Sequence, residues 1–412
     1  MIKLAMLLVG AQALRRRWAV LATLGLFWMA LGLAIMVDAS DGVNVAATEA
    51  FAILLLLEGC IALSGFTLAS RRAGYIVLFK ALALILLALM ILDFPIPVDL
   101  ERSLLFGLAF LIDGAVRITT ATIVRFPKWQ VIAAGGALEV GLGALVLSNW
   151  PVSHHQTVPF CIGLALLLSG WTVLRLGLML RRLGDHMPVL SLPVFDPRGW
   201  YRAAAAPAAV GASASLHHTT PLLVHVWTPV GSAENPERRL LVDRYIAAID
   251  GHGVISTGHA ALELPPDLYI SHYPAHEVEH SPEEFRHLLR ASPENDVPGL
   301  FQPSYAFESA DWCPADAQVA FHVYDPAKLR AHWAAYRQVD TYNLTDRNCS
   351  VTVAVALEAA LEGVLGERAV WRRFFGLMVD PDVWIAGVLR ARAESGTWTP
   401  GLVLDYARAL HA

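Results

Sequence analysis

The sequence predicts a membrane all-α bundle of six helices, built as three repeated hairpins, followed by a soluble α+β domain. Two observations predict this division. The 412 residues are 56% hydrophobic and only 16% charged, whereas an ordinary soluble domain is about 25% charged. The apolar residues gather in the first half of the chain, and a globular composition begins near residue 221. We therefore expect a transmembrane domain over 1–185, a linker over 186–220 and a soluble domain over 221–412.

Six apolar stretches are long enough to form transmembrane helices, since a helix that crosses the hydrocarbon core takes roughly 20 residues. They lie near residues 18–38, 47–69, 75–94, 103–124, 130–150 and 158–180. The loops between them are short, so consecutive helices are expected to run antiparallel. The lipid bilayer is therefore the first predicted partner of this chain.

Basic residues gather in one set of loops, which indicates the orientation of the bundle. They are Arg15, Arg16, Arg17, Arg71, Arg72, Arg125, Lys128, Arg181 and Arg182. The opposite loops contain acidic residues and prolines, with Arg102 as their only strong cation. By the positive-inside rule, both termini are predicted to lie in the cytoplasm.

The three hairpins resemble one another. Glu58-Gly59, Asp113-Gly114 and Ser169-Gly170 recur at a similar depth of the second, fourth and sixth spans. This period of about 55 residues predicts three repeated helical hairpins. Over residues 15–185, the topology and these acid-Gly and Ser-Gly pairs resemble the HdeD-like (acid-resistance) family of bacterial inner-membrane proteins. The resemblance implies a multi-pass protein of the bacterial inner membrane that acts in stress protection.

Four charged residues lie within the predicted spans: Glu58, Lys80, Asp113 and Glu139. A charge at the centre of a bilayer costs several kcal/mol, so each is expected to face the bundle interior or a charged partner. One interpretation is a path for protons or solutes. The other is a set of structural pairs that hold the hairpins together, and the absence of helices interrupted by Gly or Pro favours it.

The net charge and the linker narrow the class of partner. A formal net charge of −5 argues against nucleic-acid binding, because such proteins carry a basic surface. The linker over 186–220 is rich in proline and alanine, a composition typical of a tether. A domain tethered at the bilayer has membrane proteins or lipids as natural substrates, and the sequence leaves homo-oligomerisation open.

Strand and helix patterns are segregated in the second half, which predicts an α+β domain. Strands are expected near 221–228, 258–264, 268–273 and 318–324, and helices near 238–249, from Ser281, from Pro326 to Gln338 and over 349–365. The second and third strands form a hairpin around Pro265-Pro266-Asp267. Residues 291–317 are expected to form a long loop, which serves as a lid or a substrate wall or has no role.

Cys349 is the strongest candidate for a catalytic residue. It begins the predicted helix 349–365, where free backbone N–H groups and the helix dipole favour a thiolate and can hold an oxyanion. A thiol nucleophile also needs a base within hydrogen-bond distance and a third group that orients the base. His259 on the first strand of the hairpin fits the base, and His272 on the neighbouring strand fits the orienting group. Gly258 leaves room for their close approach.

The order of these residues resembles that of the circularly permuted papain-like proteins. The matching residues are Gly258-His259-Ala260-Ala261-Leu262, His272, Tyr342-Asn343-Leu344 and Asn348-Cys349-Ser350. Residues 220–366 thereby resemble the NlpC-type peptidases and the relatives of lecithin retinol acyltransferase.

This resemblance implies a papain-like fold and a role for each matching residue. Cys349 would be the nucleophile, His259 the base and His272 the orienting group. Asn348 and Ser350 would support the oxyanion or the site. His322, on the strand near 318–324, is the alternative to His272.

A zinc peptidase is a competing interpretation. His276-Glu277-Val278-Glu279-His280 matches the HExxH pattern, in which two histidines on one helical face bind zinc and the glutamate is the base. Pro274 before the motif and Ser281-Pro282 after it leave too little room for that helix. Cys60, Cys161 and Cys313 form no CxxC pair with each other or with Cys349. We therefore predict no metal ligand and no cofactor.

The sequence thus predicts a membrane-tethered cysteine hydrolase at the cytoplasmic face, of the protease, amidase or acyl-transfer type. One alternative is a non-enzymatic stress-response protein whose soluble domain binds a partner or senses pH through its histidines. The other is the zinc metallopeptidase. The reactivity of Cys349 and its pairing with His259 distinguish among the three.

Overall fold

A computed structural model gives the structure of the protein. It describes residues 2–40, 52–53, 55–57, 59–60, 63, 78–79, 81–86, 88–89, 92, 99–150, 153–184, 187–196, 198–201, 216–232, 245, 248–249, 255–276, 287–366 and 370–411. The chain divides into two compact units. The membrane unit comprises Arg15–Thr122 and Gln130–Arg182, and the soluble domain comprises Met1–Leu14, Ile123–Trp129 and Leu183–Ala412.

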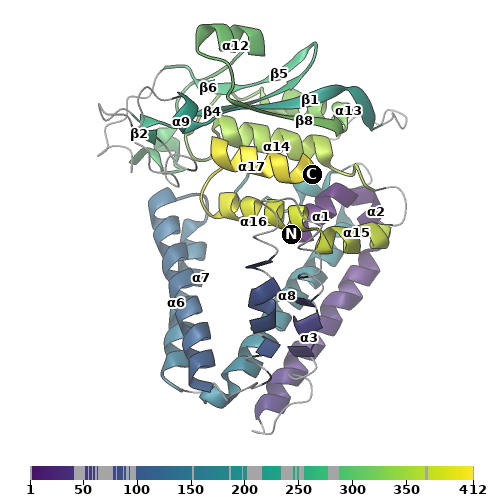
Figure 1. The fold of residues 1–412 in the computed structure, drawn as a ribbon, viewed down its shortest axis with the longest axis vertical. Coiled ribbons are helices and arrows are strands. Elements are labelled where there is room, and N and C mark those ends of the chain that lie inside the picture. The colour runs from purple at the N-terminus through teal and green to yellow at the C-terminus, as the bar shows by residue number, and fades with distance from the viewer. Residues whose placement is uncertain are drawn as a thin grey trace. The chain divides into compact units, whose positions relative to one another are not determined.

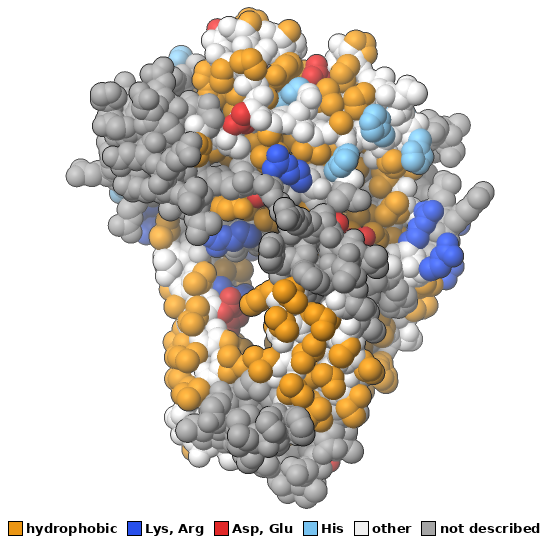
Figure 2. Space-filling model, viewed as in Figure 1, with side chains coloured by type: hydrophobic (Ala, Val, Ile, Leu, Met, Phe, Trp, Pro, Cys, Tyr) orange, Lys and Arg blue, Asp and Glu red, His pale blue; other side chains and the backbone are white. Residues whose placement is uncertain are grey.

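The membrane unit is helical. Its long helices are α3 (Trp18–Ser40), α6 (Asp99–Val124), α7 (Trp129–Leu147) and α8 (His154–Arg182). Among the described residues, these four helices are long and apolar enough to cross a membrane, and Figure 2 shows hydrophobic side chains gathered on their visible face. They confirm four of the predicted apolar helices. The spans predicted at 47–69 and 75–94 lie partly outside the described residues.

Glycines bring the helices of the membrane unit into close contact. A Cβ atom added to Gly25 of α3 would lie 2.7 Å from the carbonyl oxygen of Gly170 of α8. A Cβ atom added to Gly114 of α6 would lie 2.5 Å from the carbonyl oxygen of Gly136 of α7. Larger side chains would push these helices apart, so the glycines allow the two backbones to pack directly against each other.

The same close contact occurs three times along the chain. The glycines that make it are, in order, Gly59, Gly114 and Gly170. The residues whose carbonyl oxygens they approach are, in the same order, Ala81, Gly136 and Gly25. Both sets recur at intervals of about 55 residues, the period found in the sequence. The repeated glycines are therefore contact points between helices.

Arg117 neutralises two of the acidic residues predicted within the spans. Its Nε atom lies 2.7 Å from Asp113 Oδ2 on the same helix, α6, and 3.0 Å from Glu139 Oε2 on α7. This ion-pair geometry is that of a structural connection between neighbouring helices. Glu58 and Lys80 lie outside the described residues.

The N-terminal residues belong to the soluble domain, although the sequence grouped residues 1–185 as one transmembrane domain. Helix α1 (Ile2–Val9) is apolar but much too short to span a bilayer. Its Leu7 is fully buried. The carbonyl oxygens of Leu7 and Leu8 accept hydrogen bonds of 2.9 Å from the backbone N–H groups of Gly363 and Leu365. The short helix α2 (Ala11–Arg15) follows.

A four-stranded antiparallel sheet forms the centre of the soluble domain. Its order is β5 (Leu268–Ile270), β4 (His259–Leu264), β1 (His217–Trp227) and β8 (Ala317–Val323). Helices α14 (Cys349–Leu361) and α17 (Pro400–His411) lie along one face of the sheet, as Figure 1 shows. On the other face, Trp227 and Tyr269 pack against Tyr305. These strands and the β4–β5 hairpin confirm the predicted α+β character.

The predicted strand 268–273 is two strands in the structure. It breaks at Ser271, and the second part, β6 (His272–Pro274), pairs with β7 (Gly299–Phe301) in a separate two-stranded sheet. Residues 291–317, predicted as a loop, contain the 3-10 turn η2 (Pro293–Asn295), β7 and helix α12 (Tyr305–Asp311). That prediction was wrong because the proline-rich pattern hid a helix capped by the Ser304 hydroxyl.

The remaining elements complete the soluble domain. They are η1 (Val189–Ser191), α9 (Pro229–Ser232), β2 (Ala248–Ile249), β3 (Ile255–Ser256), α13 (Pro326–Tyr336), α15 (Val370–Val379) and α16 (Pro381–Ser395). The end of the predicted helix 238–249 is therefore strand β2, and most of the rest of that helix lies outside the described residues. Helix α13 confirms the helix predicted from Pro326.

Replacing Leu7 by Ala tests whether α1 is part of the core of the soluble domain. Because Leu7 is fully buried, the substitution should lower the unfolding free energy of that domain by about 2–5 kcal/mol. The measurement is denaturant unfolding of the detergent-solubilised protein, followed by tryptophan fluorescence. Val339→Ala, at a side chain that is 52% exposed, is the control and should change it by less than about 0.5 kcal/mol. An effect of Leu7→Ala as small as that of Val339→Ala would show that Leu7 is not part of the core of the soluble domain.

Candidate active site

Cys349 is the first residue of α14 and therefore lies at the N-terminal end of that helix. The preceding residue, Asn348, caps the helix, since its side-chain oxygen accepts a hydrogen bond of 2.8 Å from the backbone N–H of Val351. The cap fixes the first turn and leaves the positive end of the helix dipole beside the Cys349 thiol. A thiolate is stabilised at such a position.

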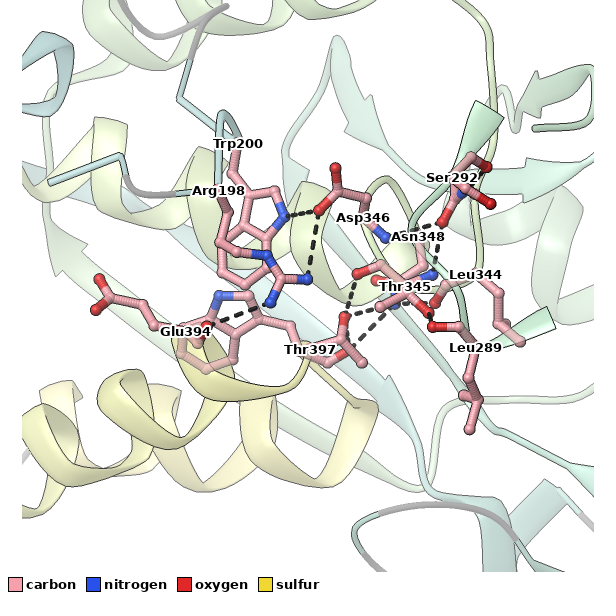
Figure 3. Close-up of polar contacts among 12 residues, drawn as sticks. Arg198, Trp200, Leu289, Ser292, Leu344, Thr345, Asp346, Asn348, Glu394 and Thr397 are labelled. Atoms are coloured by element: carbon pink, nitrogen blue, oxygen red, sulfur yellow. Dashed lines mark hydrogen bonds and ion pairs between the residues drawn. The ribbon is translucent and has the colours of Figure 1, made fainter. Parts of the chain in front are cut away.

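The loop before Cys349 is held from several sides, as Figure 3 shows. The Asn348 side-chain amide donates to the carbonyl oxygens of Leu344 at 2.7 Å and Trp398 at 3.2 Å. The Thr397 hydroxyl donates to the carbonyl oxygen of Thr345 at 2.5 Å. The loop before Cys349 is therefore joined to the segment before α17, which limits the movement of the thiol.

A second group of contacts joins this loop to the chain that follows the last span. The Trp200 indole N–H donates to Asp346 Oδ1 at 3.0 Å, and Arg198 Nη2 lies 3.5 Å from the same oxygen. Figure 3 shows both side chains converging on Asp346. Burial lowers the pKa of Arg198, and the nearby carboxylate of Asp346 opposes that shift. These residues of the predicted linker are ordered parts of the soluble domain.

His259 is the first residue of β4, opposite Trp227 of β1. A strand residue and its cross-strand partner share one face of a sheet, and the two ring centroids are 5.4 Å apart. The Tyr273 ring stacks on His259 with a centroid distance of 4.0 Å. Gly258 adopts a φ of +67°, and a Cβ atom there would lie 2.4 Å from the Trp227 carbonyl oxygen. Only glycine fits this approach without strain.

Two groups face the Nε2 atom of His259. Ser271 Oγ lies 2.9 Å away in hydrogen-bond geometry. Glu308 Oε1 lies 3.0 Å away as an ion-pair contact, although no hydrogen bond of good geometry reaches that oxygen. The other oxygen, Glu308 Oε2, accepts a hydrogen bond of 2.5 Å from the Tyr269 hydroxyl. The Tyr269 hydroxyl therefore holds one carboxylate oxygen of Glu308, and the other oxygen faces the His259 imidazole.

The pKa values of Cys349 and His259 are shifted by each other. Burial alone would raise the pKa of the Cys349 thiol, but the His259 charge, the Ser350 hydroxyl and the Ala260 N–H lower it below its ordinary value. Burial would lower the pKa of His259, yet the Cys349 thiolate and Glu308 together raise it to about 9. A thiol pKa lowered beside a histidine is typical of a nucleophile and its base, so Cys349 and His259 are candidates for these roles.

Both ring nitrogens of His272 have partners other than His259. Because β6 belongs to a separate sheet, the His272 ring points to Tyr336, whose hydroxyl lies 3.1 Å from Nδ1, and to the Asp340 carbonyl oxygen, 3.2 Å from Nε2. Burial lowers the pKa of His272 to about 4, so the ring is neutral at physiological pH. His322 is exposed on β8, and its Nδ1 lies 3.2 Å from the His218 carbonyl oxygen.

Two other predicted site residues lie beside the thiol. Ser350 Oγ is 3.7 Å from Cys349 Sγ, and Asn348 caps the helix. The structure therefore brings together four of the predicted residues: His259, Asn348, Cys349 and Ser350.

Glu308 is a site residue that the sequence reasoning missed. It lies in the first turn of α12, in the segment predicted as a loop. Burial raises the pKa of its carboxyl group, but contacts with His259, Tyr269 and Ser271 lower it below its ordinary value. Ser304 followed by Glu308 is a sequence signal for the start of a helix. No local pattern indicates that this carboxylate contacts His259.

Part of the HExxH motif can be placed. His276 is exposed at the end of β6, and Glu277–His280 lie outside the described residues. Over the part of the chain that the structure describes, no three His, Cys, Asp or Glu side chains are arranged to hold a metal ion.

Comparison with protein-family models, with curated proteins and with solved structures finds no match to this chain. The interpretation of the site therefore rests on its own geometry. That geometry consists of a thiol at a helix start, an imidazole on the adjacent strand, and a buried carboxylate behind the imidazole.

The pH dependence of Cys349 alkylation tests the ion pair. Because His259 lowers the thiol pKa, wild-type protein should react with iodoacetamide well below the ordinary thiol range. His259→Asn should raise the pKa and slow labelling at about pH 7 by roughly tenfold for each unit of the shift. Mass spectrometry of the peptide that contains Cys349 gives the rate at each pH.

Matched carboxylate variants refine this test. Glu308→Gln removes a charge that raises the His259 pKa from its ordinary value towards about 9, so it should move Cys349 ionisation to higher pH. Glu263→Gln removes the carboxylate that lies 2.8 Å from His225 on the same sheet, and it should leave Cys349 unchanged. Identical pH profiles for Glu308→Gln and wild type would show that Glu308 does not act on the pair.

Proposed function

We propose that the protein is a membrane-tethered cysteine hydrolase of the protease, amidase or acyl-transfer type. The observation that carries the proposal is the buried contact series from Cys349 to His259 to Glu308. Each member has the position that nucleophilic catalysis requires: a nucleophile, a base within reach and a group that orients the base.

The chemistry follows from these positions. The Cys349 thiolate attacks a carbonyl carbon of the substrate, and His259 returns the proton to the leaving group. Glu308 stabilises the protonated imidazole and holds its Nε2 edge, so the opposite edge of the ring is directed to the thiol. Water, or another nucleophile in a transferase, then releases the acyl group from Cys349. In this scheme Glu308 has the orienting role for which the sequence suggested His272.

The resemblance to the circularly permuted papain-like proteins supports the proposal in part. A histidine on a strand precedes a cysteine that opens a helix, in the expected order. The departure is the third group, since Ser271 and Glu308 contact His259 where the family pattern has a polar residue on the next strand. The nucleophile and the base keep the positions of the family pattern.

A six-span bundle in the bacterial inner membrane, with both termini in the cytoplasm, agrees with the repeated contacts of the membrane unit. Gly59 and Ala81 make the contact that Gly114 and Gly136 make one repeat later. The contact between Gly59 and Ala81 therefore fits a helical hairpin formed by the two spans that the sequence predicts between α3 and α6. This arrangement, together with the basic loops, supports the HdeD-like resemblance and a role in stress protection.

Formation of an acyl-enzyme tests the hydrolase proposal. Purified protein treated with p-nitrophenyl acetate should release p-nitrophenolate and carry an acetyl group on Cys349, because the thiolate displaces an activated ester. Cys349→Ala should abolish both signals. Cys313→Ala, at another free cysteine of the same domain, should retain them. If Cys349 of the wild-type protein is alkylated and acylated no faster than a free thiol, the hydrolase proposal is wrong. The soluble domain is then a binding or sensory domain.

Cysteine accessibility tests the orientation. Lys128 and Asn149 flank opposite ends of α7. Each is replaced by Cys, one at a time, in a protein from which the native cysteines have been removed. The positive-inside rule places the Lys128 end in the cytoplasm. A membrane-impermeant maleimide should therefore label Asn149→Cys in intact cells and Lys128→Cys only after lysis. The reverse pattern would invert the topology.

A further inference from the structure

The turn between α6 and α7 belongs to the soluble domain, although it joins two helices that are long and apolar enough to span a membrane. Its Phe126 is buried in one apolar cluster with Val124 and Ala291. The Val124 carbonyl oxygen accepts a hydrogen bond of 2.7 Å from the backbone N–H of Ala291. The turn is therefore docked on the soluble domain through its backbone and through a buried ring.

The backbone of this turn is strained. Arg125 and Lys128 have φ values of +49° and +67°, in the left-handed region that few residues other than glycine adopt. Conformations of this kind persist where the surrounding structure holds them in place. The contacts of Val124 and Phe126 with the soluble domain therefore fix a turn that its local sequence does not favour.

Phe126 is connected to the loop before Cys349 through Arg198. The Arg198 guanidinium lies over the Phe126 ring, 4.1 Å from the ring centroid, which is a cation–π geometry. Nη2 of the same guanidinium lies 3.5 Å from Oδ1 of Asp346, a contact that Figure 3 shows. Only 1% of the Arg198 side chain is exposed, so the groups packed against the guanidinium determine its position.

A second connection runs through the segment that contains Ala291. The Thr345 hydroxyl donates to the Leu289 carbonyl oxygen at 2.9 Å, and the Asn343 side-chain amide donates to the Ser292 carbonyl oxygen at 3.4 Å. Both donors belong to the loop that leads to the thiol. Ala291 lies between the two acceptors in the chain and donates its own N–H to the turn. The loop is thus held on two sides, and both sides contact the same turn.

We propose that Phe126 is a positioning residue for the nucleophile, acting through Arg198 and Asp346, so that the turn between α6 and α7 is part of the framework of the active site. The inference rests on the proposed function. The loop that contains Asp346 ends at the cap of α14, so a shift of this loop moves the first turn of that helix relative to His259. Phe126 takes no part in the chemistry and fixes the place from which the thiolate attacks.

Acylation of the thiol is sensitive to such a shift. In the reaction with p-nitrophenyl acetate, the Cys349 thiolate forms an S–C bond to the acetyl carbon. The C–O bond to the leaving group breaks, and p-nitrophenolate departs with its electron pair. A misplacement of about 1 Å can slow a reaction between positioned groups by about 100-fold. A residue that fixes the loop therefore affects the rate without contact with the substrate.

A double-mutant cycle on single-turnover acylation of Cys349 by p-nitrophenyl acetate tests this route. Phe126→Leu keeps an apolar side chain and removes the π face. Asp346→Asn removes the charge beside Arg198 and keeps an oxygen for the Trp200 indole. Each should slow acylation by roughly 2- to 30-fold, the range for residues of one coupled network. The double variant should be about as slow as the slower single variant, because both substitutions interrupt the same route.

Matched variants separate the route from general packing. Phe126→Tyr keeps the aromatic face and should retain the wild-type rate. Trp18→Leu removes another ring that lies under an arginine, with its centroid 4.8 Å from Cζ of Arg181 in the membrane unit, and should also retain it. The midpoint of denaturant unfolding shows whether each variant is folded. If Phe126→Leu does not fold, Arg198→Lys replaces it in the cycle, because it keeps the charge and loses the planar contact with the ring.

Three results would overturn the assignment while leaving the proposed function intact. They are a wild-type rate in Phe126→Leu, a loss in the double variant equal to the product of the two single losses, and a loss in Phe126→Tyr or Trp18→Leu as large as that in Phe126→Leu. A different result concerns the proposed function itself. If Cys349 of the wild-type protein is acylated no faster than a free thiol, the hydrolase proposal and this inference both fail.

Discussion

The arrangement of the soluble domain depends on the cost of burying charge. Cys349, His259 and Glu308 are almost wholly shielded from water, and an isolated ion in such a place is strongly unfavourable. A charge on His259 or Glu308 is stabilised because the two side chains lie 3.0 Å apart, and the Tyr269 hydroxyl donates a further hydrogen bond to Glu308. The same grouping of charges lowers the pKa of the Cys349 thiol.

A second buried cluster fixes the middle of α14. Arg390 of α16 lies 2.9 Å from Glu358 of α14, and the hydroxyls of Tyr201 and Tyr406 donate to the same carboxylate at 2.7 and 2.8 Å. Loss of one partner from a buried ion pair costs about 3–5 kcal/mol. The helix that begins with Cys349 is thus anchored at its start by the capped loop and along its length by this cluster. A fixed helix keeps the thiol at a constant distance from β4.

The membrane unit follows a different rule, because lipid provides little hydrophobic driving force between helices. Its helices meet where small residues allow backbone contact, and Gly59, Gly114 and Gly170 repeat that contact along the chain. Arg117 adds a charged connection to Asp113 and Glu139. The two halves of the protein are therefore held by different forces, close backbone packing in one and paired buried charges in the other.

The sequence by itself determined the features that depend on local pattern. Apolar length predicted the helices α3, α6, α7 and α8, the alternation around Pro265 predicted the β4–β5 hairpin, and the helix start placed Cys349. Only the tertiary structure decided which group faces His259. The break at Ser271 moves His272 into another sheet, and α12 brings Glu308 to the imidazole from 49 positions along the chain. Such a contact depends on three-dimensional packing, which no local period of the sequence encodes.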